Sequence, residues 1–228
     1  MREGIGRDRL CYVCPRSTIA VSSQILTVES AGAAGNFIAP LASLSANAFK
    51  TVIDIDTIGS FNTFKATIPH LLISAKKNPN TGTNPSTGGR IIFISATFHF
   101  TGMPLQGHAA VAKAGIDALS ATIALEYGPR GVTSNIITPG PILGTEGMAR
   151  LGNKDEEKSG EAYRKVPLQR YGSVKEIADG GVYVFSDAGN YVKYVAVFPF
   201  ISVFFSDPSL SILLRDFTNL NAVVKYWL

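Results

Sequence analysis

RIIFIS at residues 90–95 is the most informative stretch of this 228-residue chain, and it is followed by an Ala- and Leu-rich segment at 109–127 and by VTSNII at 132–137. The first and third pieces are short apolar runs rich in β-branched residues, which is typical of strands buried on both faces of a sheet. The middle piece has the length of a helix and ends at Gly128-Pro129, a pair that stops helices. Strand, helix and strand joined by short links predict a right-handed parallel crossover.

The flanking segments extend this parallel unit. Residues 43–73 are rich in helix formers with apolar side chains at helical spacing, and we expect one long core helix there. Residues 76–89 collect Asn, Pro, Thr and Gly, which is typical of a surface loop. Ser173 with Glu176 three residues later forms a capping box ahead of a further helix at 177–185. This order of elements predicts an α/β fold with a Rossmann-like, doubly wound parallel sheet that is incomplete at the N-terminal half.

Composition favours a folded chain. The chain is 46% hydrophobic and 17% charged, which suffices for a sizeable buried core and is too little charge for a disordered polymer. The 21 Lys and Arg exceed the 17 Asp and Glu, but they are scattered, so we expect no nucleic-acid partner. No run approaches the roughly 20 apolar residues that span a bilayer, so we expect no membrane partner either.

The two cysteines, Cys11 and Cys14, are spaced like half of a zinc knuckle or like a redox pair. No second pair of cysteines follows to complete a tetrahedral site, and coincidence is the favoured interpretation. We therefore expect no metal and no disulfide framework, and a reducing compartment is the default.

Four segments, in order and at matching spacing, resemble the short-chain dehydrogenase/reductase family. They are GAAGNF at 32–37, DIDTIG at 54–59, Lys113 within GHAAVAK at 107–113, and PGPILGTEG at 139–147. The resemblance implies an irregular segment at 1–30, a family-like core at 31–192 and an unaligned tail at 193–228.

Two replacements narrow the resemblance. Ordinary members of the family carry a Tyr four residues before the Lys and a Ser thirteen before that Tyr, and here these positions are Ala109 and Ala96. Without a phenol near an ammonium group, alcohol–ketone chemistry has no evident acid. The same double loss, together with Asp56 in place of the family's usual Asn, is similar to peroxisomal-type 2,4-dienoyl-CoA reductases. The strings AAGNF, NAFKTV and GTEG at 33–37, 47–52 and 144–147 carry the same similarity.

The resemblance implies NADPH-dependent reduction of a 2,4-dienoyl-CoA to a 3-enoyl-CoA in the β-oxidation of unsaturated acyl chains. It implies two catalytic residues: Asp56, which would position a proton-donating water, and Lys113, which would bind the nicotinamide ribose and add positive charge near the developing oxyanion. Phe37 would form an apolar wall for the acyl chain, and Arg150 would bind a phosphate of coenzyme A. The implied cofactor contacts are Ala34, Gly35, Lys113, Pro139, Gly140, Ile142 and Thr145.

Each of these residues also has an ordinary structural interpretation. Lys113 could be a surface lysine, although a single Lys on an apolar helix is costly to bury unpaired. Asp56 could be an acid on a helix surface, residues 139–145 a plain turn, and Arg150 a solvated charge. His108 precedes Ala109 and is better explained as a packed histidine than as a substitute acid, because its side chain points elsewhere on the helix.

A second hypothesis is a catalytically silent fragment of the same family. The glycine-rich turn that receives a pyrophosphate is not found before residue 31, since Gly4-Ile5-Gly6 is too short, and the family's last strand is not recognisable after Val192. A third possibility, a carbonyl reductase, would need a Tyr near Lys113, and none is available at that spacing.

The resemblance implies a peroxisomal location, although the chain ends Tyr-Trp-Leu and not in a peroxisomal tripeptide; the alternative location is cytoplasmic. It also implies a homo-oligomer formed through the long helices if the protein is complete.

Overall fold

The computed structural model describes residues 29–30, 36–79, 81, 88–192 and 196–197. Its elements in chain order are β1 (Glu29–Ser30), η2 (Leu41–Ser43), α1 (Ala46–Ile53), η3 (Asp54–Ile58), α2 (Gly59–Lys77), β2 (Gly89–Ile94), α3 (Phe98–Thr101), α4 (Gly107–Tyr127), η4 (Gly128–Arg130), β3 (Val132–Ile137), α5 (Glu146–Leu151), α6 (Lys154–Ser159), α7 (Glu161–Arg164), α8 (Val174–Phe185), η5 (Asp187–Gly189) and β4 (Ala196–Val197).

The four strands form one parallel sheet in the order β1-β2-β3-β4. Strands β2 and β3 pair along their whole length, from Gly89 opposite Val132 to Ile94 opposite Ile137. Helix α4 connects them, so the predicted strand-helix-strand unit is confirmed. The carboxyl ends of β2 and β3 therefore lie side by side, where ligands bind in open α/β sheets.

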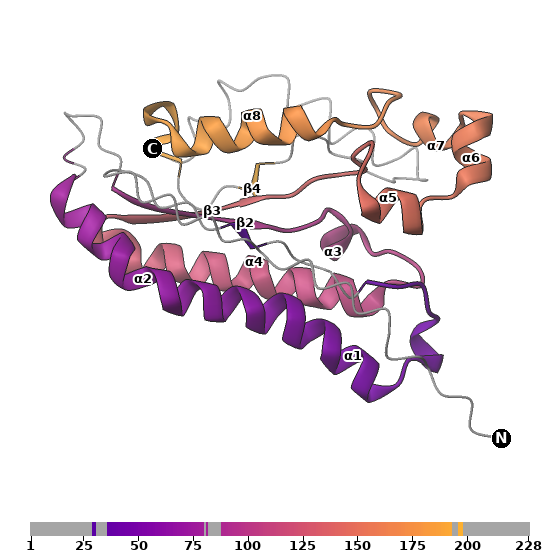
Figure 1. Ribbon diagram of the computed structural model, residues 1–228, viewed down its shortest axis with the longest axis horizontal. Coiled ribbons are helices and arrows are strands. Elements are labelled where there is room, and N and C mark those ends of the chain that lie inside the picture. Colours follow the sequence, from indigo (N-terminus) through magenta and orange to yellow (C-terminus); the bar gives the residue numbers. More distant parts are fainter. Residues whose placement is uncertain (1–28, 31–35, 80, 82–87, 193–195, 198–228) are drawn as a thin grey trace, which may run out of the picture.

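Helices cover both faces of the sheet, as a doubly wound fold requires. Figure 1 shows α2 and α4 side by side below the sheet and α8 above it. Because side chains alternate along a strand, Ile91 and Phe93 of β2 pack in the cluster on the α2 and α4 side, whereas Ile92 packs with Ile137 and Val184 on the α8 side. The prediction of two buried faces for these strands is thus confirmed.

The helix predicted at residues 43–73 has different bounds and is not uniform. It begins at Ala46, where the hydroxyl of Ser45 accepts a hydrogen bond from the backbone of Ala48 at 3.1 Å, and it continues to Lys77. Between α1 and α2 the backbone forms a single π-helical turn, η3, at Asp54–Ile58. The apolar spacing runs through this turn without interruption, so the sequence pattern gives no sign of it. Such turns are frequently found at functional sites.

A buried arginine fixes the end of α8 on the sheet. The guanidinium group of Arg90, in β2, donates to the carbonyl oxygens of Val184 at 3.0 Å and Ser186 at 2.6 Å, and to the side-chain oxygen of Asn190 at 2.8 Å. Burial lowers the pKa of Arg90, and the nearby carboxylate of Asp187 acts in the opposite direction. These bonds hold the carboxyl end of α8 against the sheet.

The chain beyond α8 returns to the sheet. The side chain of Asn135, in β3, donates to the carbonyl oxygen of Val192 at 3.0 Å. Further along the chain, Ala196–Val197 pairs in parallel with the end of β3. A strand therefore follows Val192, and the unaligned tail expected from residue 193 stays a prediction.

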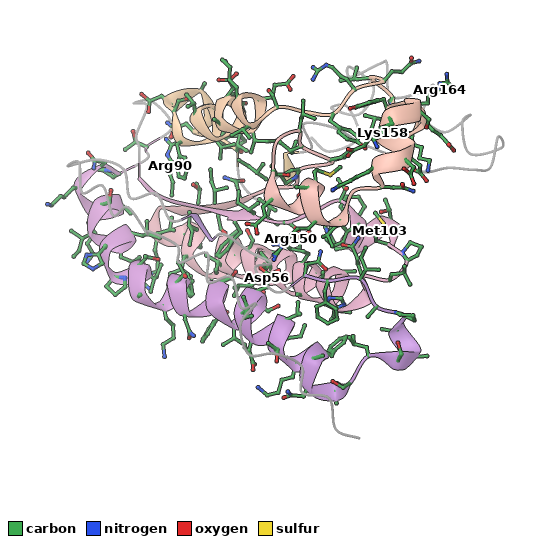
Figure 2. The ribbon with its side chains drawn as sticks, turned by 45° about the vertical axis from the view of Figure 1, so that its right-hand side comes forward. Asp56, Arg90, Met103, Arg150, Lys158 and Arg164 are labelled. Carbon is green, nitrogen blue, oxygen red and sulfur yellow. The ribbon has the colours of Figure 1, made fainter. Side chains whose placement is uncertain are left out.

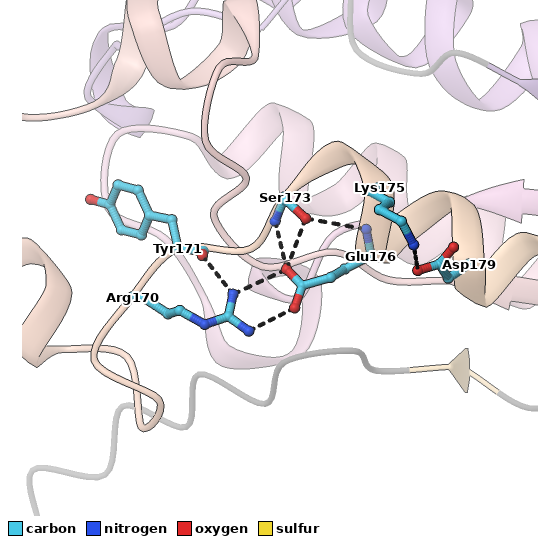
Figure 3. Close-up of polar contacts among 6 residues, drawn as sticks. All are labelled: Arg170, Tyr171, Ser173, Lys175, Glu176 and Asp179. Carbon is cyan, nitrogen blue, oxygen red and sulfur yellow. Dashed lines mark hydrogen bonds and ion pairs between the residues drawn. The ribbon is translucent and has the colours of Figure 1, made fainter.

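The amino end of α8 has the predicted capping box, shown in Figure 3. The hydroxyl of Ser173 accepts from the backbone of Glu176, while the carboxylate of Glu176 accepts from the backbone of Ser173 at 2.8 Å. Arg170 adds two bonds to the same carboxylate, at 2.6 and 3.0 Å. This partner, followed by the backbone of Ser173, lowers the pKa of Glu176 to about 2.

Several predictions concern residues outside the described ranges. These are the Cys11 and Cys14 pair, the segment at 1–28, Ala34 and Gly35 of the implied cofactor site, residues 80 and 82–87 of the loop at 76–89 and nearly all of the tail at 193–228.

Candidate active site

The two residues expected to carry the chemistry form one buried ion pair. The ammonium nitrogen of Lys113, on α4, lies 3.2 Å from both carboxylate oxygens of Asp56, in η3. The Lys113 side chain is 4% exposed and that of Asp56 is fully buried. The alternatives of a surface lysine and a helix-surface acid are therefore wrong for this pair. Figure 2 shows Asp56 among the helices that cover this face of the sheet.

The π-helical turn and a close helix contact bring the pair together. The hydroxyl of Thr57 donates to the backbone carbonyl of Ala112 at 3.0 Å, which joins η3 to α4 directly beside Lys113. Gly115 makes this approach possible, because a Cβ atom at that position would lie 2.9 Å from the methyl carbon of Thr57. The turn changes the direction in which Asp56 points, and the glycine lets α4 approach it.

The pair lies at the carboxyl end of β2. Besides Asp56, the ammonium group of Lys113 binds the carbonyl oxygen of Ile94 at 3.0 Å. A buried ion pair is costly to desolvate, and its retention contributes specificity of structure or function more than stability. The two charges lie at the edge of the sheet where a ligand site is expected, and this gives a functional reason for the cost of desolvating them.

An apolar cavity of about 410 Å³ opens at the same edge, on the α8 side of the sheet. Its lining comprises Ile92, Ile94, Ile137, Pro139, Ile142, Thr145, Val174, Ile177, Ala178, Gly181 and Phe185. Neither Lys113 nor Asp56 is among these residues. Ile94 connects the two places, because its side chain lines the cavity and its carbonyl oxygen accepts from Lys113. The ion pair and the cavity thus lie on the two faces of one strand end.

The loop after β3 contributes three of the residues expected to bind the cofactor. Pro139, Ile142 and Thr145 line the cavity, and Gly140 lies between them in the chain. The hydroxyl of Thr145 donates to the carbonyl oxygen of Ile142 at 2.9 Å and accepts from the backbone of Met148, which caps α5. The loop therefore has a structural explanation, and its cofactor contacts stay a prediction.

Thr138, just before this loop, is a polar residue that the sequence did not single out. Its side chain is fully buried, and within the described part of the chain its hydroxyl has no hydrogen-bond partner. A buried hydroxyl without a partner is costly and requires an explanation. It lies at the carboxyl end of β3, where a ligand or water could complete its hydrogen bonding.

Phe37 lies beside the start of α4. Its ring stacks on that of His108 with centroids 4.3 Å apart, and it is 36% exposed. His108 is fully buried, neither of its ring nitrogens has a hydrogen-bond partner among the described residues, and burial lowers its pKa. It is a packed histidine, as predicted. The exposed part of Phe37 remains available as the apolar wall expected for an acyl chain.

Arg150 lies on α5, as Figure 2 shows, and about half of its side chain is exposed. Its guanidinium group pairs with Glu146 one turn earlier at 3.3 Å. Pairs of this kind at a surface contribute little stability, so a phosphate could replace the carboxylate at low cost. The coenzyme A contact of Arg150 stays a prediction.

A second polar pair near Lys113 was missed by sequence reasoning. His99, on α3, lies 2.5 Å from the carboxylate of Asp117, which is one turn beyond Lys113 on α4. The available signal was an acid four residues after the lysine on an otherwise apolar helix.

The described residues contain no group of three or more His, Cys, Asp or Glu side chains that could hold a metal ion. No helix among them has the length and apolar character required to cross a membrane.

Comparison with known proteins shows which family the sequence matches. Residues 25–196 match the family model described as "Enoyl-(Acyl carrier protein) reductase". A peroxisomal 2,4-dienoyl-CoA reductase [(3E)-enoyl-CoA-producing] of Saccharomyces cerevisiae is 53% identical over 163 residues, which are 71% of this chain and 50% of that protein. The protein of the same name from Danio rerio is 45% identical over 160 residues, 70% of this chain and 49% of the relative. The chain thus spans about half the length of these curated relatives.

Solved structures show the same fold. A short chain dehydrogenase from Bacillus anthracis is 30% identical, with a TM-score of 0.61, over 77% of this chain and 63% of that one. A putative NAD(P) dependent gluconate 5-dehydrogenase from Beutenbergia cavernae, solved with bound NADP, has a TM-score of 0.65 at 22% identity, over 76% of this chain and 64% of that one. At that identity the likeness concerns the fold alone.

Proposed function

The chain belongs to the short-chain dehydrogenase/reductase family, and on that premise we propose that it serves the NADPH-dependent reduction of a 2,4-dienoyl-CoA to a 3-enoyl-CoA. The observation that carries the proposal is the buried Lys113 and Asp56 pair at the carboxyl end of β2, in a site where Ala109 and Ala96 replace the phenol and hydroxyl of ketone-reducing members. The similarity to peroxisomal 2,4-dienoyl-CoA reductases supports the same substrate class and a peroxisomal location.

The residues present fit part of a nicotinamide cofactor's site. The apolar cavity at Pro139, Ile142 and Thr145 has a size within the range of small-molecule pockets, and the buried hydroxyl of Thr138 lacks a partner within the described residues. Pro139, Gly140, Ile142 and Thr145 would hold the cofactor from this loop. Lys113, at the other face of the strand end, and Ala34 and Gly35, earlier in the chain, would complete its contacts. When bound, NADPH supplies a hydride to the far end of the conjugated acyl chain and leaves as NADP⁺.

Lys113 and Asp56 have different roles in the remaining chemistry: Lys113 stabilises negative charge, and Asp56 assists proton transfer. Reduction at the far end of the chain leaves negative charge on the thioester oxygen, and the fixed ammonium group of Lys113 stabilises that charge where it develops. Asp56 holds Lys113 in place and accepts a hydrogen bond from a water that protonates the carbon next to the thioester. One hydride and one proton are added, and one double bond remains, between the third and fourth carbons.

Phe37 and Arg150 would bind the two ends of the substrate. The partly exposed ring of Phe37 offers an apolar surface to the acyl chain, and the guanidinium group of Arg150 offers a bidentate partner to a phosphate of coenzyme A. A homo-oligomer formed through the long helices is part of the same proposal, because the continuous helical segment of α1, η3 and α2 presents exposed apolar side chains such as Ile55, Ile58 and Phe61.

Titration of NADPH fluorescence against the purified chain tests the proposal at its first step. We expect saturable binding that Lys113→Met weakens about tenfold or more, since one charge-assisted hydrogen bond is lost. Lys175→Met is the matched control, because Lys175 is exposed on α8 and pairs only one turn away with Asp179. Absence of saturable binding by the wild-type chain would instead favour the catalytically silent alternative.

A further inference from the structure

His99 and Asp117 form a second polar cluster next to the ion pair. Nε2 of His99 lies 2.5 Å from one carboxylate oxygen of Asp117, and the two side chains are 11% and 17% exposed. Nδ1 of the same ring lies 2.6 Å from the carbonyl oxygen of Ala96, and the hydroxyl of Ser95 is 3.4 Å away. The ring is therefore held between the end of β2 and helix α4.

These distances favour one protonation state of the pair. A backbone carbonyl can only accept, so Nδ1 of His99 carries a hydrogen. The contact between Nε2 and Asp117 also requires a hydrogen, since two lone pairs at 2.5 Å would repel each other. That hydrogen belongs either to the imidazolium or to the carboxylic acid. In both cases the pair carries one proton more than a neutral imidazole with a carboxylate, and its net charge is zero.

The surroundings of Asp117 are consistent with this proton. Burial raises the pKa of Asp117, while Ser95, His99 and Lys113 act in the opposite direction. Two further charged groups adjoin the pair: Lys113, one turn earlier on α4, acts on Asp117, and Asp56, in η3, contacts Lys113. With the shared proton, the four groups sum to zero charge. Without it, two carboxylates would share the single ammonium group of Lys113.

We propose that His99 and Asp117 share one proton and act as positioning residues. The shared proton offsets the negative charge of Asp117, so the positive charge of Lys113 stays available to Asp56 and to the substrate oxyanion. The second half of this inference rests on the proposed function. Neither residue needs to touch the substrate, because a carboxylate one helical turn from Lys113 acts through the electric field.

Nitrogen-15 NMR of the three histidines tests the shared proton without any need for catalysis. At neutral pH we expect both ring nitrogens of His99 to carry protons, or to show one strongly deshielded proton shared with Asp117. His70, which is exposed, and His108, which is buried without partners, are internal references in the same spectrum. In Asp117→Asn that signature should disappear. A wild-type His99 ring with a free Nε2 lone pair would overturn the inference.

Kinetics with a charge-compensated double variant test the consequence for Lys113. His99→Gln leaves the Asp117 carboxylate without a counter-charge, and we expect kcat to fall about tenfold or more with KM changed less than about twofold. Adding Asp117→Asn removes that charge and should restore kcat to within about threefold of the wild type. A double variant slower than both single variants would mean a merely structural role and would contradict the inference. A wild-type chain with no NADPH-dependent activity defeats the proposed function, and the NMR result alone then decides on the pair.

Discussion

The ammonium nitrogen of Lys113 lies 3.2 Å from each carboxylate oxygen of Asp56, although the two residues are 57 positions apart in the chain. The fold brings them together by a π-helical turn on one side and a glycine contact on the other. Both charges are withdrawn from water at the edge of a parallel sheet where ligands bind. The pair is therefore the structural centre of the proposed chemistry.

The first prediction concerns the stability of this pair. Asp56→Leu or Lys113→Met alone should lower the free energy of unfolding by about 3–5 kcal/mol, because each leaves a buried charge without its partner. The double variant should lose less than either single variant, since an apolar pair needs no desolvation. Urea denaturation of the four proteins measures this coupling. Additive losses would show that the two charges do not depend on each other.

The second prediction concerns Gly115, which allows η3 to pack closely against α4 beside Lys113. Gly115→Ala should lower the free energy of unfolding by about 1–3 kcal/mol, because the new methyl group would lie 2.9 Å from that of Thr57. Combination with Thr57→Ser should recover part of the loss, since serine lacks the methyl group and keeps the hydroxyl that binds Ala112. Thermal or chemical denaturation provides the comparison. Equal stability of Gly115→Ala and the wild type would refute the close packing.

The third prediction concerns Arg90, the buried cation at the end of α8. Arg90→Met should lower the free energy of unfolding by about 2–4 kcal/mol, because the carbonyl oxygens of Val184 and Ser186 lose their donors. Arg90→Lys should lose less than Met and still be destabilised, since one ammonium group cannot reproduce the planar fork. Arg130→Lys is the exposed control and should have little effect. A fully stable Arg90→Lys protein would show that charge alone suffices.

The fourth prediction concerns pH and the cap of α8. The pKa of Glu176 is lowered from 4.5 to about 2 in the folded chain. A lowered folded pKa means stability that is present above the unfolded value and is lost as the pH falls from about 4.5 towards about 2. The denaturation midpoint should thus fall more steeply over this range in the wild type than in Glu176→Gln. Because the Arg170 partner is at the surface, added salt should reduce the difference. Parallel pH profiles would contradict this account.

Much of the fold could be predicted from local sequence alone. Strand β3 matches its predicted range, β2 and α4 differ by one or two residues, and the capping box of α8 is present as expected. These elements are marked by strong local signals: β-branched apolar runs, a Gly-Pro stop and a paired Ser and Glu. For the candidate site, the sequence indicated Asp56 and Lys113 but not that they touch.

The remainder depends on contacts between distant parts of the chain. The π-helical turn at Asp54–Ile58 has no local signature, because it depends on how α1 and η3 pack against α4. Strand β4 has only two residues, and their place depends on pairing with β3 more than on their own propensity. His99 and Asp117 meet only because α3 folds back over α4.

The location of deuterium in the product tests the central claim most directly. The chain would be incubated with a 2,4-dienoyl-CoA and NADPH that carries deuterium at the transferable position of the nicotinamide, and the product analysed by mass spectrometry. We predict a 3-enoyl-CoA with one deuterium on the far carbon of the former diene, formed by the wild type and not by Lys113→Met. A product with deuterium next to the thioester, or equal product from Lys113→Met, would contradict the roles given to Lys113 and Asp56.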